Sequence, residues 1–133
     1  MESVALDGSR RVLIVDDEKN VSTTLGQIFQ GRGYEVRSAL SAEQAIELAT
    51  NWVPELALLD VGLPGMNGVD LAILLLDQHP NCRVLLFSGR PDSEDLVNKA
   101  AERGRSLPIL AKPVHPDVLL AWAKGLPSAE LSA

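Results

Sequence analysis

Five short strand-like runs alternate with five helix-like segments along the chain, and this alternation constrains the fold more than any other feature. The strand-like runs are mostly apolar and rich in Val, Ile and Leu; they cover residues 12–15, 34–37, 56–59, 84–87 and 107–111. Strands that are apolar throughout must be covered on both faces, so the pattern predicts an α/β fold in which helices flank a single parallel sheet. At 133 residues the chain has the length of one domain. We expect this domain to span residues 10–125, with flexible tails at 1–9 and 126–133.

The intervening segments carry helix signals. In the first, Val21, Leu25, Ile28 and Phe29 recur at helical spacing before a stop at Gly31. The second begins in a capping box formed by Ser41 and Gln44, runs to about Thr50, and is followed by a third helix over residues 69–78. We expect the fourth helix to be capped by Asp92, with an inward stripe of Leu96, Val97, Ala100 and Ala101, and the fifth to run from Pro116 to Gly125.

Polar side chains stand where the strand-like runs end. Asp16 and Asp17 follow the first run, Asp60 the third, Ser88 the fourth and Lys112 the fifth. The carboxyl ends of parallel strands share one edge of a sheet, and ligands bind there in open α/β folds. A carboxylate at the end of a buried strand is costly unless it is compensated, so we expect these five side chains to form one site.

Clustered carboxylates repel one another unless a cation joins them, and oxygen ligands of this kind suit Mg2+ (or Mn2+). Asp17 and Asp60 are the candidates for direct ligands, with Asp16 acting through water and the backbone carbonyl of Gly62 completing the set. With such an ion in place, Asp60 can act as a nucleophile toward a phosphoryl group and form an aspartyl phosphate. Lys112 and the hydroxyl of Ser88 would then each hold a phosphoryl oxygen.

These motifs resemble the receiver domain of bacterial two-component response regulators over nearly the whole chain. The resemblance rests on four segments, which are residues 12–18 (VLIVDDE), residues 58–60 with 63–68 (LLD, LPGMNG), residues 86–89 (LFSG) and Lys112-Pro113. Each segment alone is a modest signal, whereas all four in order, one per expected strand end, are specific.

The resemblance implies a flavodoxin-like fold with strand order 2-1-3-4-5 and a cis peptide bond at Lys112-Pro113. It also implies Mg2+-dependent phosphorylation of Asp60 by a sensor histidine kinase or a phosphotransfer protein. In this family such phosphorylation switches a protein–protein interaction surface, through which we expect the chain to act on a downstream target protein or output domain.

One departure from the family concerns the switch, and two positions that vary within the family concern the lifetime of the phosphoryl group. Family members usually have Tyr or Phe three residues before the lysine, where this chain has Ile109. Ile109 cannot act with Ser88 through rotation of an aromatic ring, although a packing shift at Ser88 remains open. The two positions that tune phosphoryl lifetime in the family are Gly62 and Arg90 here; Gly62 has no side chain to exclude water, and Arg90 either shields the phosphoryl group or points into solvent.

The expected third helix contains six consecutive apolar residues, Leu71 to Leu76, which cannot all point inward at a period of 3.6 residues. Ile73, Leu74 and Leu76 occupy positions that are usually charged in the family. They form either an apolar patch without a partner or a surface for a partner or a homodimer.

Composition excludes several other classes of protein. Twelve basic and eighteen acidic residues give a net charge of −6, which opposes direct nucleic-acid binding. No apolar run approaches the roughly 20 residues of a membrane span. Cys82 is the single cysteine, and no secretory signal is visible at Met1–Asp7, so we expect a cytoplasmic protein.

Other functions remain to be weighed. A haloacid-dehalogenase-like phosphatase needs a second acid where Gly62 stands, and a flavin carrier needs a phosphate loop where Asp16 and Asp17 stand. A pseudo-receiver that is never phosphorylated stays open because of Ile109. The eight residues after Gly125 are too few for an output domain, so the chain is either a stand-alone regulator or the receiver half of a truncated transcriptional regulator.

Overall fold

The computed structural model describes residues 10–89, 93–102, 104 and 107–125, and within these ranges it contains a parallel sheet with the strand order β2-β1-β3-β4-β5. This is the order that the resemblance implied. The strands are β1 (Arg11–Val15), β2 (Glu35–Ala39), β3 (Leu56–Asp60), β4 (Arg83–Ser88) and β5 (Ile109–Ala111). The helices are α2 (Lys19–Gln30), α3 (Ala42–Asn51), α4 (Gly68–Gln78), α5 (Ser93–Glu102) and α6 (Pro116–Ala123).

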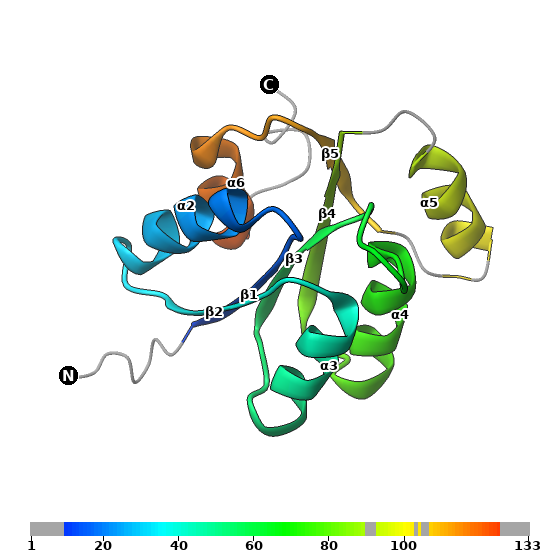
Figure 1. Ribbon diagram of the computed structural model, residues 1–133, viewed down its shortest axis with the longest axis horizontal. Helices are drawn as coiled ribbons and strands as arrows, with labels where there is room; N and C mark the ends of the chain where they lie inside the picture. The colour runs from blue at the N-terminus through cyan, green and yellow to red at the C-terminus, as the bar shows by residue number, and fades with distance from the viewer. Residues whose placement is uncertain (1–9, 90–92, 103, 105–106, 126–133) are drawn as a thin grey trace.

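The helices cover both faces of the sheet, with α2 and α6 on one side and α3, α4 and α5 on the other (Figure 1). Because side chains alternate between the two faces of a sheet, neighbouring residues of a strand pack in two separate hydrophobic cores. Leu59 and Leu86 pack toward α3, α4 and α5, whereas Leu58, Leu85 and Phe87 pack toward α2 and α6. The expected doubly wound α/β architecture is therefore confirmed.

The second and fifth strands differ from their predicted bounds. The predicted strand 34–37 begins one residue later, because the backbone N–H of Tyr34 donates to the carbonyl of Phe29 at 3.1 Å and closes the end of α2. The predicted strand 107–111 is shortened to Ile109–Ala111. Pro108 lacks the N–H that would extend the ladder, although its carbonyl still accepts from the N–H of Leu86 at 2.9 Å.

The predicted inward stripe of the fourth helix is partly wrong. Ala100 is buried and Val97 is half-buried, but Ala101 is exposed. The buried stripe of this helix is therefore narrower than the sequence pattern predicts. The predicted cap Asp92 and the side chain of Leu96 lie outside the part of the chain that the structure describes.

The apolar helix α4 is more covered than its sequence indicates. Ile73 and Leu76 are half-buried and pack against the core beneath α3 and α5, and Leu74 is half-buried as well. Among the described residues, the large hydrophobic side chains that are exposed are Leu40 and Val53. The role of the α4 positions as a partner or homodimer surface stays a prediction.

Two local arrangements fix helix ends. The Oγ of Ser41 accepts from the N–H of Gln44 at 3.1 Å, as the predicted capping box requires. The side chain of Gln44 accepts at 2.7 Å from the N–H of Leu40, one residue before the N-cap, instead of from the N–H of Ser41. At the C-terminal end of α6, the guanidinium of Arg83 donates to the carbonyls of Trp122 at 2.6 Å and Ala123 at 3.2 Å. It also lies 4.7 Å from the centre of the Trp122 ring.

No helix in the described ranges has both the length and the apolar character needed to span a membrane.

Candidate functional site

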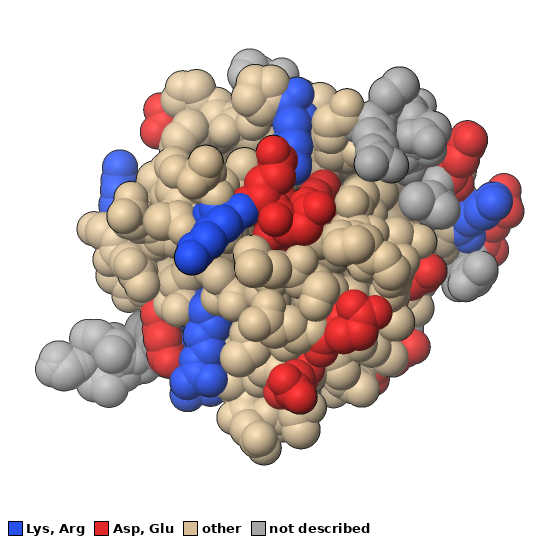
Figure 2. Space-filling model, viewed as in Figure 1, with Lys and Arg blue, Asp and Glu red and all other residues tan. Residues whose placement is uncertain are grey.

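The carboxyl edge of the sheet gathers three aspartates. Strand pairing places Val15 opposite Leu59, so the residues that follow them, Asp16 and Asp60, come to the same point of the edge. Asp16, Asp17 and Asp60 each offer a carboxylate oxygen, and these atoms all lie within 4.8 Å of one another. Asp16 is fully buried, Asp60 is 6% exposed and Asp17 is exposed. Figure 2 shows acidic side chains gathered at this end of the molecule beside Lys and Arg side chains.

Lys112 brings a cation to the same edge. Its Nζ lies 3.0 Å from Oδ2 of Asp16, 3.5 Å from Oε1 of Glu18 and 3.5 Å from Oδ2 of Asp60. The backbone N–H of Lys112 donates to the carbonyl of Ser88 at 2.8 Å, which holds the ends of β4 and β5 together. The Lys112-Pro113 peptide bond is cis, as expected.

Burial and charge set the protonation of the two central groups. Burial raises the pKa of the Asp60 carboxyl, and the charge of Asp16 adds to this, while Lys112 and the N–H of Gly62 act in the opposite direction. For Lys112, burial lowers the pKa, but the hydrogen bond to Asp16 and the charges of Asp60, Asp16 and Glu18 outweigh it, so its pKa is raised overall. The site therefore combines a carboxylate of increased basicity with a firmly protonated ammonium.

The loop after β3 is folded tightly around Asp60. The N–H of Gly62 donates to Oδ1 of Asp60 at 3.2 Å, and the N–H of Gly68 donates to the carbonyl of Val61 at 3.0 Å. Leu63 is buried and anchors the loop in the core. Asn67 caps α4 by accepting from the N–H of Asp70 at 2.9 Å. These contacts leave the Asp60 carboxylate fixed at the edge of the sheet.

The structure describes only some of the residues predicted to act in the switch or to tune the lifetime of the phosphoryl group. Ser88 is buried at the end of β4, within the same edge as Asp60 and Lys112. Ile109 pairs with Leu86 and packs, half-buried, against the core on the side of α3, α4 and α5. Arg90 lies outside the described residues.

Comparison with protein families decides what kind of domain this is. The model for the response regulator receiver domain matches residues 12–124. The chain belongs to this family. The receiver domain thus accounts for nearly all of the residues that the structure describes.

Curated relatives of this receiver domain differ in size. The chain is 30% identical to sporulation initiation phosphotransferase F of Bacillus subtilis over 109 residues, which cover 82% of this chain and 86% of that protein. It is 37% identical to the alginate biosynthesis transcriptional regulatory protein AlgB of Pseudomonas putida over its full length, but spans 29% of that protein. It is also 34% identical to a cyclic di-GMP phosphodiesterase of Thermotoga maritima, over 81% of this chain and 28% of that protein.

Solved receiver structures have the same fold. A CheY-like receiver domain protein from Methanospirillum hungatei superposes with a TM-score of 0.76 at 28% identity, over 92% of this chain and 94% of that one. A response regulator from Burkholderia pseudomallei, solved with a phosphorylated aspartic acid, a calcium ion and citrate, gives a TM-score of 0.78 at 28% identity. That match covers 92% of this receiver domain and 71% of the other chain.

Two residues near the site were not predicted as members of it. Glu18 contacts Lys112, although the sequence indicates it only as the last residue of the segment 12–18. Gly68 packs against the backbone of Asp60 so closely that no side chain fits there. Gly68 belongs to the segment 63–68 that carries the family resemblance, but nothing local to the sequence indicated the backbone that this glycine meets.

Proposed function

We propose that this receiver domain accepts a phosphoryl group on Asp60 from a sensor histidine kinase or a phosphotransfer protein and thereby switches a protein–protein contact. One observation carries the proposal: a buried carboxylate at the end of β3 lies 3.5 Å from the Lys112 ammonium and beside two further carboxylates. This is a phosphoacceptor role in signalling and not the turnover of a separate substrate. We place it in the cytoplasm, where kinases draw on ATP.

The three carboxylates fit a divalent metal ion. Asp17 and Asp60 would bind Mg2+ or Mn2+ directly, with Asp16 acting through water and the Gly62 carbonyl as a further oxygen ligand. The fit rests on the convergence of hard oxygen donors within 4.8 Å, one of them exposed and two of them buried. When bound, the ion would offset the negative charge of an incoming phosphoryl group.

The chain's own groups carry the transfer. An Oδ of Asp60 forms a bond to phosphorus while the bond from phosphorus to the donor atom breaks, and the electron pair of that bond leaves with the donor. Lys112 and Ser88 lie at the same edge, and in this proposal each holds a phosphoryl oxygen.

A groove beside the site suits the docking of a donor. It has a volume of about 510 Å³ and lies between α2 and the segment after β5. Its walls are mainly apolar, with Val21, Leu25 and Ile28 on one side and Pro113 and Val114 on the other, and Lys112 lies among its lining residues. An amphipathic donor helix laid in this groove would bring a phosphohistidine toward Asp60.

The rival proposal of a pseudo-receiver is weaker on this geometry. A module that is never phosphorylated has no need to keep the buried, destabilising carboxylate of Asp60 at the end of β3, beside Lys112, which directly follows β5. The output is assigned to a protein contact, made by a downstream target or by a further domain, because the net charge of −6 opposes direct nucleic-acid binding.

The deciding experiment is intact mass after incubation with acetyl phosphate, with and without Mg2+, beside the Asp60→Asn variant. A single phosphoryl group that requires Mg2+ and is absent from the variant would support the proposal. Normal phosphorylation of Asp60→Asn would show that the acceptor is another residue. No gain of mass, together with no binding of beryllofluoride, would favour the pseudo-receiver.

The docking groove is tested separately with the Val21→Asp variant. We expect slower transfer from a phosphorylated histidine kinase and an unchanged rate with acetyl phosphate, which needs no docking surface. Equal slowing with both donors would place the defect in the site itself.

A further inference from the structure

Three carboxylates surround the Lys112 ammonium before any phosphoryl group arrives, and Lys112 donates hydrogen bonds to those of Asp16 and Glu18. An ammonium has three N–H donors. Carboxylate oxygens of Asp16, Glu18 and Asp60 lie 3.0, 3.5 and 3.5 Å from its nitrogen. A phosphoryl group on Asp60 takes over that residue's own contact with Lys112, and its dianionic charge must then share the ammonium with the carboxylates of Asp16 and Glu18.

Asp16 is the contact least able to leave. Its side chain is fully buried, and its other oxygen accepts from the backbone N–H of Glu18 at 2.8 Å. The side chain of Glu18 is 66% exposed, so water can replace Lys112 as the partner of the Glu18 carboxylate at little cost. Glu18 is thus the displaceable partner of Lys112.

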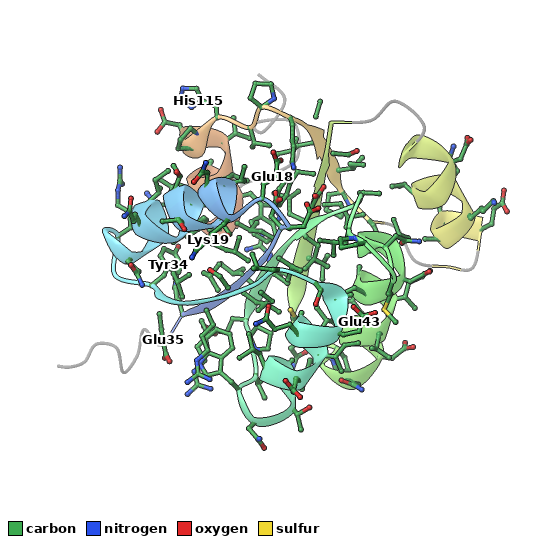
Figure 3. The ribbon with its side chains drawn as sticks, viewed as in Figure 1. Glu18, Lys19, Tyr34, Glu35, Glu43 and His115 are labelled. Atoms are coloured by element: carbon green, nitrogen blue, oxygen red, sulfur yellow. The ribbon has the colours of Figure 1, made fainter. Side chains whose placement is uncertain are left out.

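The position of Glu18 supports a role toward Lys112 rather than toward its own helix. Glu18 is the N-cap residue of α2, yet its side chain makes no capping hydrogen bond. Ser, Thr, Asp and Asn are the side chains preferred at this position. Figure 3 shows Glu18 where α2 begins, at the end of the sheet opposite Glu35.

We propose that Glu18 holds the place of the phosphoryl group on Lys112 before phosphorylation and that its charge slows reaction with dianionic phosphodonors. Glu18 is a positioning residue in this scheme, since it acts through Lys112 and by repulsion. The proposal rests on the function assigned to Asp60 above. With acetyl phosphate the step is balanced: the Asp60 oxygen bonds to phosphorus, the phosphorus–oxygen bond to the acetyl group breaks, and acetate leaves.

The test is the rate of phosphorylation of Glu18→Gln, followed by rapid quenching and intact mass in the presence of Mg2+. Acetyl phosphate, a dianion at neutral pH, is compared with phosphoramidate, which carries a smaller net charge. Gln keeps the shape of Glu and loses its charge, so we expect the rate with acetyl phosphate to rise about three- to tenfold at low salt. The rise with phosphoramidate should be smaller, and both should shrink as salt is added. A residue that only stabilised the fold would not produce this dependence on donor charge.

Two further variants complete the design. Glu18→Asp keeps the charge and should react at nearly the wild-type rate. Glu55→Gln removes one exposed carboxylate at the opposite end of β3 and should leave the rate unchanged, because Glu55 directly precedes the first residue of that strand and Asp60 is the last.

The outcomes separate the two proposals. If wild-type protein is phosphorylated but Glu18→Gln reacts no faster than wild type with either donor, the role of Glu18 is refuted and that of Asp60 stands. A rate increase of equal size in Glu55→Gln would also refute it, since the effect would then be one of overall charge. If wild-type protein gains no phosphoryl group and binds no beryllofluoride, the proposed function fails and the role of Glu18 falls with it.

Discussion

Gly68, the first residue of α4, lies directly against the backbone carbonyl of Asp60, so that a side chain at position 68 would collide with the carbonyl oxygen. The start of α4 and the proposed acceptor residue are therefore in rigid contact. Glycine is required here for close approach and not for an unusual backbone angle, since Gly68 is not among the described glycines with positive φ.

The Gly68→Ala variant should consequently be destabilised by about 2 kcal/mol or more, because neither backbone segment can yield easily. Its phosphorylation by acetyl phosphate should also slow, as the loop around Asp60 is displaced. Urea unfolding provides the measurement. The matched control is Gly26→Ala within α2, where the new Cβ would meet Val36 Cγ1 at an ordinary 3.5 Å. That variant should gain roughly 0.5–1 kcal/mol from helix propensity. Equal stability of the two variants would contradict the packing described for Gly68.

The pKa of Asp60 predicts a stabilising substitution. Burial and the charge of Asp16 raise this pKa in the folded protein, so Asp60 favours the fold only when it is protonated. This contribution is complete below the unfolded-state pKa and is lost as the pH rises through the folded-state pKa. At neutral pH, Asp60→Asn should therefore melt a few degrees above wild type in the absence of metal. The difference should shrink as the pH is lowered toward 4, the ordinary range of an aspartate. A lower melting temperature for Asp60→Asn at neutral pH would be inconsistent with the raised pKa.

Lys112→Ala should have the opposite effect. Loss of the ammonium leaves Asp16, which is fully buried, without its 3.0 Å partner, and it removes the cation between Glu18 and Asp60. We expect a loss of about 3 kcal/mol in unfolding free energy. Added Mg2+ should restore more stability to this variant than it adds to wild type, because among the described residues Lys112 is the cation that pairs with these carboxylates. Thermal melts with and without Mg2+ measure both effects, and an equal response to Mg2+ in the two proteins would argue against a shared metal and lysine site.

The contacts of Arg83 with the C-terminal end of α6 give a prediction away from the site. Arg83→Ala removes two hydrogen bonds to helix carbonyls and the contact with Trp122, so we expect a loss of about 2–3 kcal/mol and a shift in tryptophan fluorescence. Arg37→Ala is the comparison, because Arg37 lies 5.0 Å from the Trp52 ring centre and is exposed. That change should cost at most about 1 kcal/mol. If both variants lose the same stability, the carbonyl contacts of Arg83 contribute little.

Much of the site could be predicted from the sequence, because each polar residue follows an apolar run and parallel strands end at one edge. Asp16, Asp60, Ser88 and Lys112 reach that edge for this reason. The contact between Lys112 and Asp16 could not be predicted, since the sequence pattern indicates only that both residues reach this edge, and it predicts that Asp16 acts on a metal ion through water. Which of two cations a carboxylate contacts depends on side-chain geometry, and strand spacing does not determine it.

The limits of the elements were less predictable than their order. β5 is shorter than its apolar run because Pro108 cannot donate to the ladder, and β2 begins after Tyr34 because that residue closes α2. Both changes depend on the hydrogen bonding of a single amide group. The half-buried state of Ile73 and Leu76 depends on the neighbouring helices, which a helical period alone cannot place.

The alternation of side chains between two cores also bears on how such a domain can diversify. The groove beside Lys112 belongs to the layer of α2 and α6, whereas Ile109 and the apolar side of α4 belong to the opposite layer. If the groove docks the phosphodonor, as we propose, changes that alter which donor is recognised can accumulate on one side without repacking the other. The strand backbones, and the charged edge where they end, are the parts that both layers share.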